Sequence, residues 1–264
     1  MINFNTDRII LVYYPSGAGG KFLINSLGLS DKSVFQSQQL AKKQLKEQFT
    51  NKDKIDYLIS EINKINNTWN DLNLGCEQMF DRTAQGVRSL KIQNLSNDIR
   101  NLFEFPNVIE HIIKQNYYFF VVCHDITILA KTLNFWPNAQ VIEFVNYIPF
   151  QKKYRKIDDN HYGVFKGPAW PNNFPSIQEY LKLESSVQLD IENYYPGFRY
   201  FRNNKKQADR VIFQWNTNNY MSYENTLFYF KELCKILNLN DIDFTDFELY
   251  YKTWIDKLDE LSKI

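Results

Sequence analysis

The sequence predicts an α/β fold in three layers, α/β/α, around a central parallel sheet. Three short apolar runs, at residues 9–14, 117–123 and 139–146, are separated by stretches with helical spacing. Continuous apolar runs of this length are typical of strands that are buried on both faces. Strands separated by helices favour parallel pairing, because a parallel neighbour needs a crossover connection.

The first of these runs belongs to a strand, a turn and a helix. "IILVYY", residues 9–14, ends at Pro15 and is followed by three glycines in "PSGAGGKFL". Residues 21–29 continue with apolar side chains at helical spacing. Residues 33–66 look mostly helical and polar, and "KIDYLISEINKI" has the helical period. We expect residues 67–90 to be irregular or a helical excursion, and residues 97–114 to be a helix.

The second half starts with the strand "YYFFVVC", followed by a turn and a short helix in "HDITILAKTL" and by the strand "AQVIEFVN". Residues 156–209 are rich in Asn, Pro and Tyr and predict an irregular segment. Within it "SIQEYLKLE" favours a helix, whereas "FRYFRNNKKQADR" is basic and loop-like. "VIFQW", residues 211–215, is a further strand.

Two amphipathic stretches, "YENTLFYFKELCKILNL" and "DFELYYKTWIDKLDELSKI", complete the pattern. Asp246 or Thr245 is the expected cap of the second helix. We therefore expect one α/β domain over residues 1–264, with a helical insertion at 33–114 and an irregular segment at 156–209.

Composition narrows the classes of function. The chain has 264 residues, 44% of them hydrophobic and 23% charged, which is a globular composition. Its formal net charge is +1, so we expect no nucleic-acid partner. The three cysteines lie far apart, without the spacing of a disulfide framework or a zinc site. No signal peptide or apolar span of about 18 residues is evident, so we expect a cytoplasmic, reducing location and no membrane contact.

The glycine-rich turn is the strongest chemical signal. A strand, a glycine turn and a helix point backbone N–H groups at one spot, where the helix dipole and Lys21 favour an anion. The nucleotide-triphosphate pattern GxxxxGK[ST] matches at Gly20 and Lys21, but Pro15 and Phe22 depart from it. The missing Ser or Thr is the residue that holds Mg²⁺, so the turn favours an anion that needs no metal. The alternative is a turn that only packs the helix on the strand.

Polar residues follow the next two strands, and ligands of open parallel sheets bind at these strand ends. His124 suits a general base, or else a partly buried structural histidine. Asp125 suits a magnesium ligand, or else the N-cap of the following helix. Asn146 follows the third strand. A basic cluster at residues 152–155 is either an anion contact or a solvated surface.

In their order along the chain, these motifs resemble those of sulfotransferases that use PAPS (3′-phosphoadenosine 5′-phosphosulfate). "YPSGAGGKFL" is similar to their phosphosulfate loop, "VVCHD" to their strand followed by His, and "WPNAQVIEFVNYIP" to their next strand. The closing helices resemble those of bacterial and phage members. The resemblance covers residues 8–30, 117–155 and 211–256.

The resemblance implies a P-loop sulfotransferase-like fold, PAPS as cofactor and no metal. It implies Lys21 and His124 as catalytic residues. The implied cofactor-binding residues are Ser16, Gly17, Ala18, Gly19, Gly20, Lys21, Phe22, Asn146 and Tyr154. Asn146 stands where the family has an Arg, and Tyr154 where it has a Ser. The expected acceptor is a carbohydrate or another small molecule. The alternatives are a non-catalytic binding or structural module with this fold and a nucleotide-dependent P-loop kinase.

Overall fold

The computed structural model of the chain describes residues 8–14, 18–33, 51–65, 118–123, 126–155 and 175–263. The expected irregular segment at 67–90 and the expected helix at 97–114 lie outside these residues. The protein is a mixed α/β fold with a parallel sheet, as predicted. In the described part of the chain, no helix combines the length and the apolar character needed to cross a bilayer.

The sheet has four parallel strands in the order β2–β1–β3–β4. The strands are β1 (Ile9–Tyr13), β2 (Phe119–Cys123), β3 (Gln140–Val145) and β4 (Val211–Asn216). All four lie where the sequence predicts strands, within one or two residues. In register, Tyr13 of β1 lies between Cys123 of β2 and Glu143 of β3. The carboxyl ends of the three strands therefore meet at one edge of the sheet.

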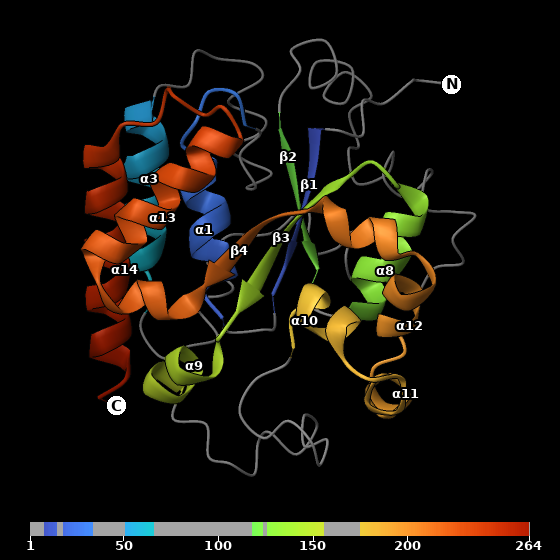
Figure 1. The fold of residues 1–264 in the computed structure, drawn as a ribbon. Coiled ribbons are helices and arrows are strands. Elements are labelled where there is room, and N and C mark those ends of the chain that lie inside the picture. Colours follow the sequence, from blue (N-terminus) through green and yellow to red (C-terminus); the bar gives the residue numbers. More distant parts are fainter. Residues whose placement is uncertain are drawn as a thin grey trace.

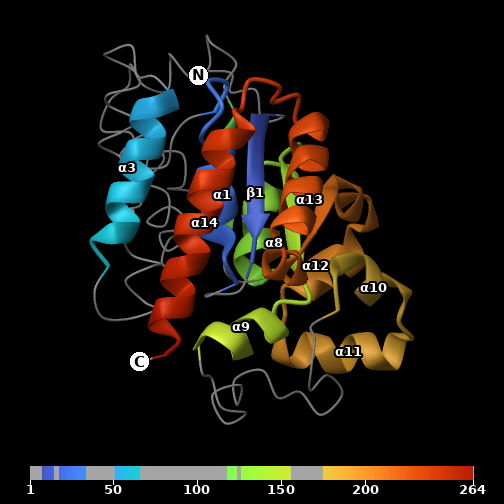
Figure 2. The same ribbon diagram turned by 90° about the vertical axis from the view of Figure 1, so that its left-hand side faces the viewer.

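Helices pack on both faces of this sheet (Figure 1). One face carries α1 (Gly20–Leu27), α3 (Asn51–Asn63), α13 (Tyr223–Ile236) and α14 (Phe244–Leu261), and Figure 2 shows the molecule from this side. Ile10 and Val12 of β1 point into this side, whose core is rich in aromatic rings. The short helix α9 (Ile148–Arg155) adds Phe150 and Tyr154 to the same core.

The other face carries α8 (Ile126–Phe135), α10 (Ile177–Lys182), α11 (Ser185–Tyr194) and α12 (Phe198–Asn203). Ile9 and Leu11 of β1 point to this side. The alternation along β1 explains its apolar run: successive side chains point to opposite faces, and helices cover both of them.

Two predictions in the second half were wrong. Residues 198–210, expected as a loop, form α12 and the 3₁₀ helix η4 (Lys205–Arg210), because Phe198 and Phe201 are spaced three apart and bury one face. Helix α11 is likewise helical where an irregular segment was expected, whereas α10 confirms the helix predicted for "SIQEYLKLE". The cap of α14 is Asp243, neither Thr245 nor Asp246: its carboxylate accepts from the Thr245 N–H.

Candidate functional site

The connections between strands diverge at the centre of the sheet. The chain runs from β1 to β2 by way of α1. It runs from β3 to β4 in the opposite direction along the sheet, first through α9 on the α1 side and then through α10 to α12 on the other side. The gap between the carboxyl ends of β1 and β3 is thus a topological switch point, the usual place for a ligand in an open α/β sheet. The glycine-rich turn follows β1, and Asn146 follows β3, so this arrangement brings both predicted elements to the switch point.

The glycine turn is closely packed where the structure describes it. Gly19 is the N-cap of α1 and has a left-handed backbone, with φ of 77°. Gly20 begins the helix, and a Cβ atom there would lie 2.3 Å from ring atoms of Tyr14. Ala18, Gly19 and Gly20 are all buried. Both glycines are therefore required by the backbone, one for its φ and one for its close approach to Tyr14.

Phe22 occupies the position of the metal-binding hydroxyl in the triphosphate pattern, and its side chain is 2% exposed. Its ring stacks on Trp254, at 4.3 Å between centroids, and on Tyr250, at 5.0 Å. The Phe22 side chain is therefore part of the aromatic core. Its predicted contact with a cofactor is left to its backbone N–H. The neighbouring Lys21 is half-buried in the first turn of α1, and its catalytic role stays a prediction.

Asn146 ends β3 in a left-handed conformation, with φ of 54°. Asparagine adopts this region more readily than most other residues, arginine included. Its carbonyl accepts a hydrogen bond of 2.7 Å from the Thr217 hydroxyl, and its side chain is half-exposed. The backbone therefore gives a physical reason for Asn where the resemblance implies an Arg.

Tyr154 lies on α9 and is 4% exposed. Its ring packs against Phe150, and its hydroxyl accepts a hydrogen bond of 2.7 Å from Lys153, whose amine also lies 3.8 Å from the Asp259 carboxylate. Burial raises the pKa of Tyr154 above its usual value, although Lys153 opposes this rise. Tyr154 thus keeps little surface for a ligand, and its role in cofactor binding stays a prediction. Lys153, from the predicted basic cluster, is engaged with Tyr154 and Asp259.

Four other candidate site residues lie outside the described part of the chain. They are Ser16, Gly17, His124 and Asp125. The predicted general base is among them, so its place relative to Lys21 stays a prediction.

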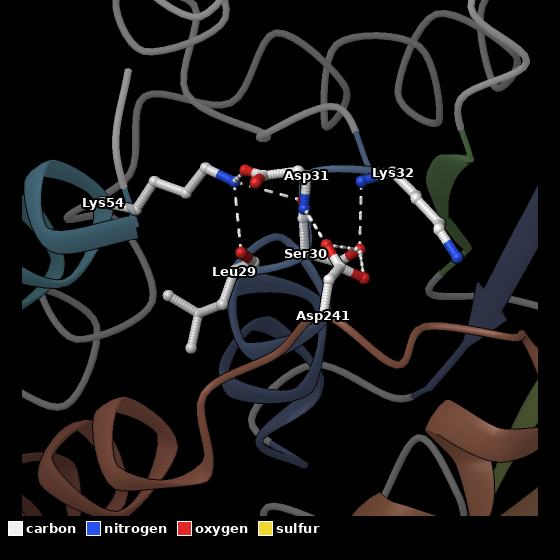
Figure 3. A network of polar contacts seen from close by, with 6 residues as sticks. All are labelled: Leu29, Ser30, Asp31, Lys32, Lys54 and Asp241. Atoms are coloured by element: carbon white, nitrogen blue, oxygen red, sulfur yellow. Dashed lines mark hydrogen bonds and ion pairs between the residues drawn. The ribbon is translucent and has the colours of Figure 1, made fainter. Parts of the chain in front are cut away.

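The far end of α1 is held by a polar network (Figure 3). The Lys54 amine, fully buried on α3, donates to the carbonyls of Leu29 and Ser30 and to the Asp31 carboxylate. Burial lowers the pKa of Lys54, while Asp31 raises it. The Asp241 carboxylate accepts from the Ser30 hydroxyl and from the Asp31 N–H. Leu29 and Ser30 directly follow the C-cap of α1, so these contacts fix the chain at the end of α1 opposite the glycine turn.

Sequence reasoning missed Glu143, although a charged residue inside the apolar run "AQVIEFVN" was the available signal. Glu143 is 1% exposed and lies beside Tyr13 at the carboxyl edge of the sheet. Its carboxylate accepts a hydrogen bond of 2.8 Å from the Ile177 N–H, at the start of α10, and one of 3.1 Å from the Gln214 side chain. Burial raises the pKa of Glu143 to about 7, against the opposing effect of these two donors.

This burial predicts a pH-dependent stability. The folded pKa of Glu143 is about 7 and its ordinary value 4.5, so between these values the folded state binds more protons than the unfolded state. Stability should therefore fall as pH rises through this window, by up to roughly 3 kcal/mol. Glu143→Gln, which can still accept from Ile177, should lose this dependence. Urea unfolding of both proteins across the window checks it, and parallel stability curves would contradict it.

Sequence reasoning also missed Thr217 and Tyr220. Both lie on η5 (Thr217–Met221), a short 3₁₀ helix after β4. Tyr220 is fully buried, and its hydroxyl donates a hydrogen bond of 3.0 Å to the Gly19 carbonyl. One tyrosine among 17 carries no signal in the sequence for a contact with a residue 201 positions away.

No family model matches the chain, and comparisons with curated proteins and with solved structures find no match.

Proposed function

We propose that this protein is a sulfotransferase, which transfers a sulfuryl group from PAPS to a hydroxyl of a carbohydrate or small-molecule acceptor. The proposal includes the finer fold assignment, a three-layer P-loop sulfotransferase-like domain. The observation that carries it is the left-handed glycine turn at the switch point of a parallel sheet, with Lys21 beside it. Phe22 adds support for metal-free chemistry, because its ring is part of the core.

The described residues fit an anionic group at this place. The first N–H groups of α1 have no partner within the helix, and the helix dipole adds partial positive charge. Gly19 and Gly20 let this turn pack closely against the rings of Tyr220 and Tyr14, which places the first N–H groups of α1 at the carboxyl end of β1. PAPS supplies an activated sulfuryl group on a 5′-phosphate. Under this proposal the N–H groups of residues 17–22 hold that phosphate, and Lys21 stabilises negative charge on the bridging oxygen.

Transfer requires an in-line attack by the acceptor oxygen on sulfur. The new O–S bond forms as the bond from sulfur to the bridging phosphate oxygen breaks, and 3′-phosphoadenosine 5′-phosphate (PAP) leaves. His124 takes the proton of the acceptor hydroxyl. Positioning and charge stabilisation supply most of the rate, as they do in phosphoryl transfer. The acceptor pocket is expected from residues 33–114 and 156–209.

A non-catalytic module with the same fold is the second candidate. Two observations favour it. The left-handed backbone at position 146 accounts for an asparagine there, and burial in the core accounts for a tyrosine at position 154. Neither residue then needs a ligand to account for it. This candidate predicts that the crevice binds no nucleotide.

Lys21→Ala is expected to weaken the binding of PAP by about tenfold or more, because a charge-assisted contact with phosphate is lost. Lys131→Ala is the matched control, since this exposed lysine lies on α8 and the change should leave affinity unaltered. Thermal shift and calorimetry with PAP, with ATP and Mg²⁺, and with buffer alone give the measurement. If the parent protein does not bind PAP, the cofactor assignment is refuted. A response to ATP with Mg²⁺ would favour a kinase.

A further inference from the structure

Two residues with a left-handed backbone flank the switch point, and the short helix η5 donates a hydrogen bond to each of them. Gly19 follows β1 and Asn146 ends β3. The Gly19 carbonyl accepts from the Tyr220 hydroxyl at 3.0 Å, and the Asn146 carbonyl accepts from the Thr217 hydroxyl at 2.7 Å. Both donors belong to η5. The contact to Gly19 joins residues 201 positions apart, and the contact to Asn146 joins residues 71 positions apart.

Further hydrogen bonds fix η5 in place. The Asn216 side chain caps it by accepting from the Asn218 N–H. The Tyr251 hydroxyl donates 2.8 Å to the Tyr220 carbonyl, and the Thr226 hydroxyl donates 2.6 Å to the Asn219 carbonyl. The two hydroxyls that reach the strand ends therefore come from a rigid support.

Tyr220 also fits closely against the glycine turn. A Cβ atom at Gly19 would lie 2.8 Å from its ring, and the ring packs against Phe22, Phe150 and Trp254. Burial raises the pKa of Tyr220 well above its usual value, so its hydroxyl stays protonated and remains a donor.

Peptide geometry links these contacts to ligand binding. In a trans peptide unit, the C=O and the following N–H point in opposite directions. When Tyr220 fixes the Gly19 carbonyl, it also fixes the Gly20 N–H, which points away from Tyr220 and out of the amino end of α1. Thr217 fixes the peptide unit between Asn146 and Tyr147 in the same way. Each hydroxyl thereby sets the direction of a backbone N–H at one side of the switch point.

We propose that η5 is a shared brace for the two sides of the switch point, in which Tyr220 and Thr217 are positioning residues. They hold the turns after β1 and β3 in their left-handed conformations and couple one turn to the other. The consequence for ligand affinity rests on the proposed function, whereas the coupling of the two turns does not.

Hydrogen exchange tests the coupling without any ligand. Tyr220→Phe and Thr217→Val each remove one hydroxyl and keep the shape of the side chain. We expect each variant to speed exchange at both turns, residues 18–22 and 146–148, while β1 stays protected. Thr217→Ser keeps a hydroxyl and should restore the parental rates. Thr132→Val, which removes a buried hydroxyl within α8, is the matched control. If each variant affects only its own turn, the brace is refuted.

Titration with PAP tests the positioning role. In a parent protein that binds PAP, each variant should bind about three- to tenfold more weakly. The double variant should lose less than the two single losses combined, because both act through one brace. Unchanged affinity in both single variants, or strictly additive losses, would overturn the positioning role. If the parent protein binds no PAP, the proposed function fails while the exchange measurement still decides the coupling.

Discussion

Replacing Gly20 by alanine is expected to destabilise the fold by about 3 kcal/mol. The new Cβ atom would lie 2.3 Å from two atoms of the Tyr14 ring and 2.4 Å from a third. That ring cannot move aside easily, because Tyr14 is 2% exposed and packs against Phe144 at 5.3 Å between centroids. The clash therefore pushes the start of α1 away from the end of β1, and both are parts of the candidate site.

A double-mutant cycle isolates this clash. Tyr14→Leu alone should be destabilising, because it removes a buried aromatic ring from the core. In the Tyr14→Leu background, however, Gly20→Ala should cost clearly less than in the parent, since the smaller side chain makes room for the Cβ atom. Urea unfolding of the four proteins measures the coupling. An equal cost of Gly20→Ala in both backgrounds would show that the Tyr14 ring is not the obstacle.

The parts of the fold that the sequence predicts are those whose signal is local. The strand Ile9–Tyr13 is predicted from its continuous apolar run, because its side chains point alternately to two faces of the sheet that helices cover. Helix α10 is signalled by its own first turn, where Ser176 and Glu179 form a capping box. The glycine pattern likewise predicts a tight turn before α1, since glycine tolerates the left-handed φ of Gly19.

The parts that the sequence does not predict depend on distant partners. Helix α12 has a basic surface, and the burial of Phe198 and Phe201 against the neighbouring helices, α10 among them, explains why it is helical. Glu143 needs both the first N–H group of α10 and Gln214 of β4, and neither can be assigned to it from spacing alone. Much of the candidate site is of this second kind. The loop can be located from its glycines, whereas the supporting hydroxyls of η5 follow only from the packing of the chain.

Phe22→Ser is expected to destabilise the protein by about 4 kcal/mol, although it restores the Gly-Lys-Ser of the nucleotide-triphosphate pattern. Phe22 contacts five aromatic rings of the core. They are those of Tyr220, Phe247, Tyr250, Tyr251 and Trp254. Serine would leave a cavity among them and bury a hydroxyl there. Phe228→Ser is the matched control, because Phe228 is 60% exposed on α13 and its loss should change the free energy of unfolding little.

Phe22→Ser also tests whether restoring the nucleotide-triphosphate pattern is enough to create a magnesium site. A serine at position 22 would point toward Trp254 and Tyr250, where the Phe22 ring now stacks. Mg²⁺ requires several oxygen ligands and retains part of its water shell, and an aromatic core provides neither. Phe22→Ser should therefore gain no Mg²⁺-dependent stabilisation by ATP in a thermal-shift titration. A protein as stable as the parent, or one that gains such a response, would place Phe22 at the mouth of the loop. A gained response to ATP would also replace the metal-free assignment with that of a triphosphate site.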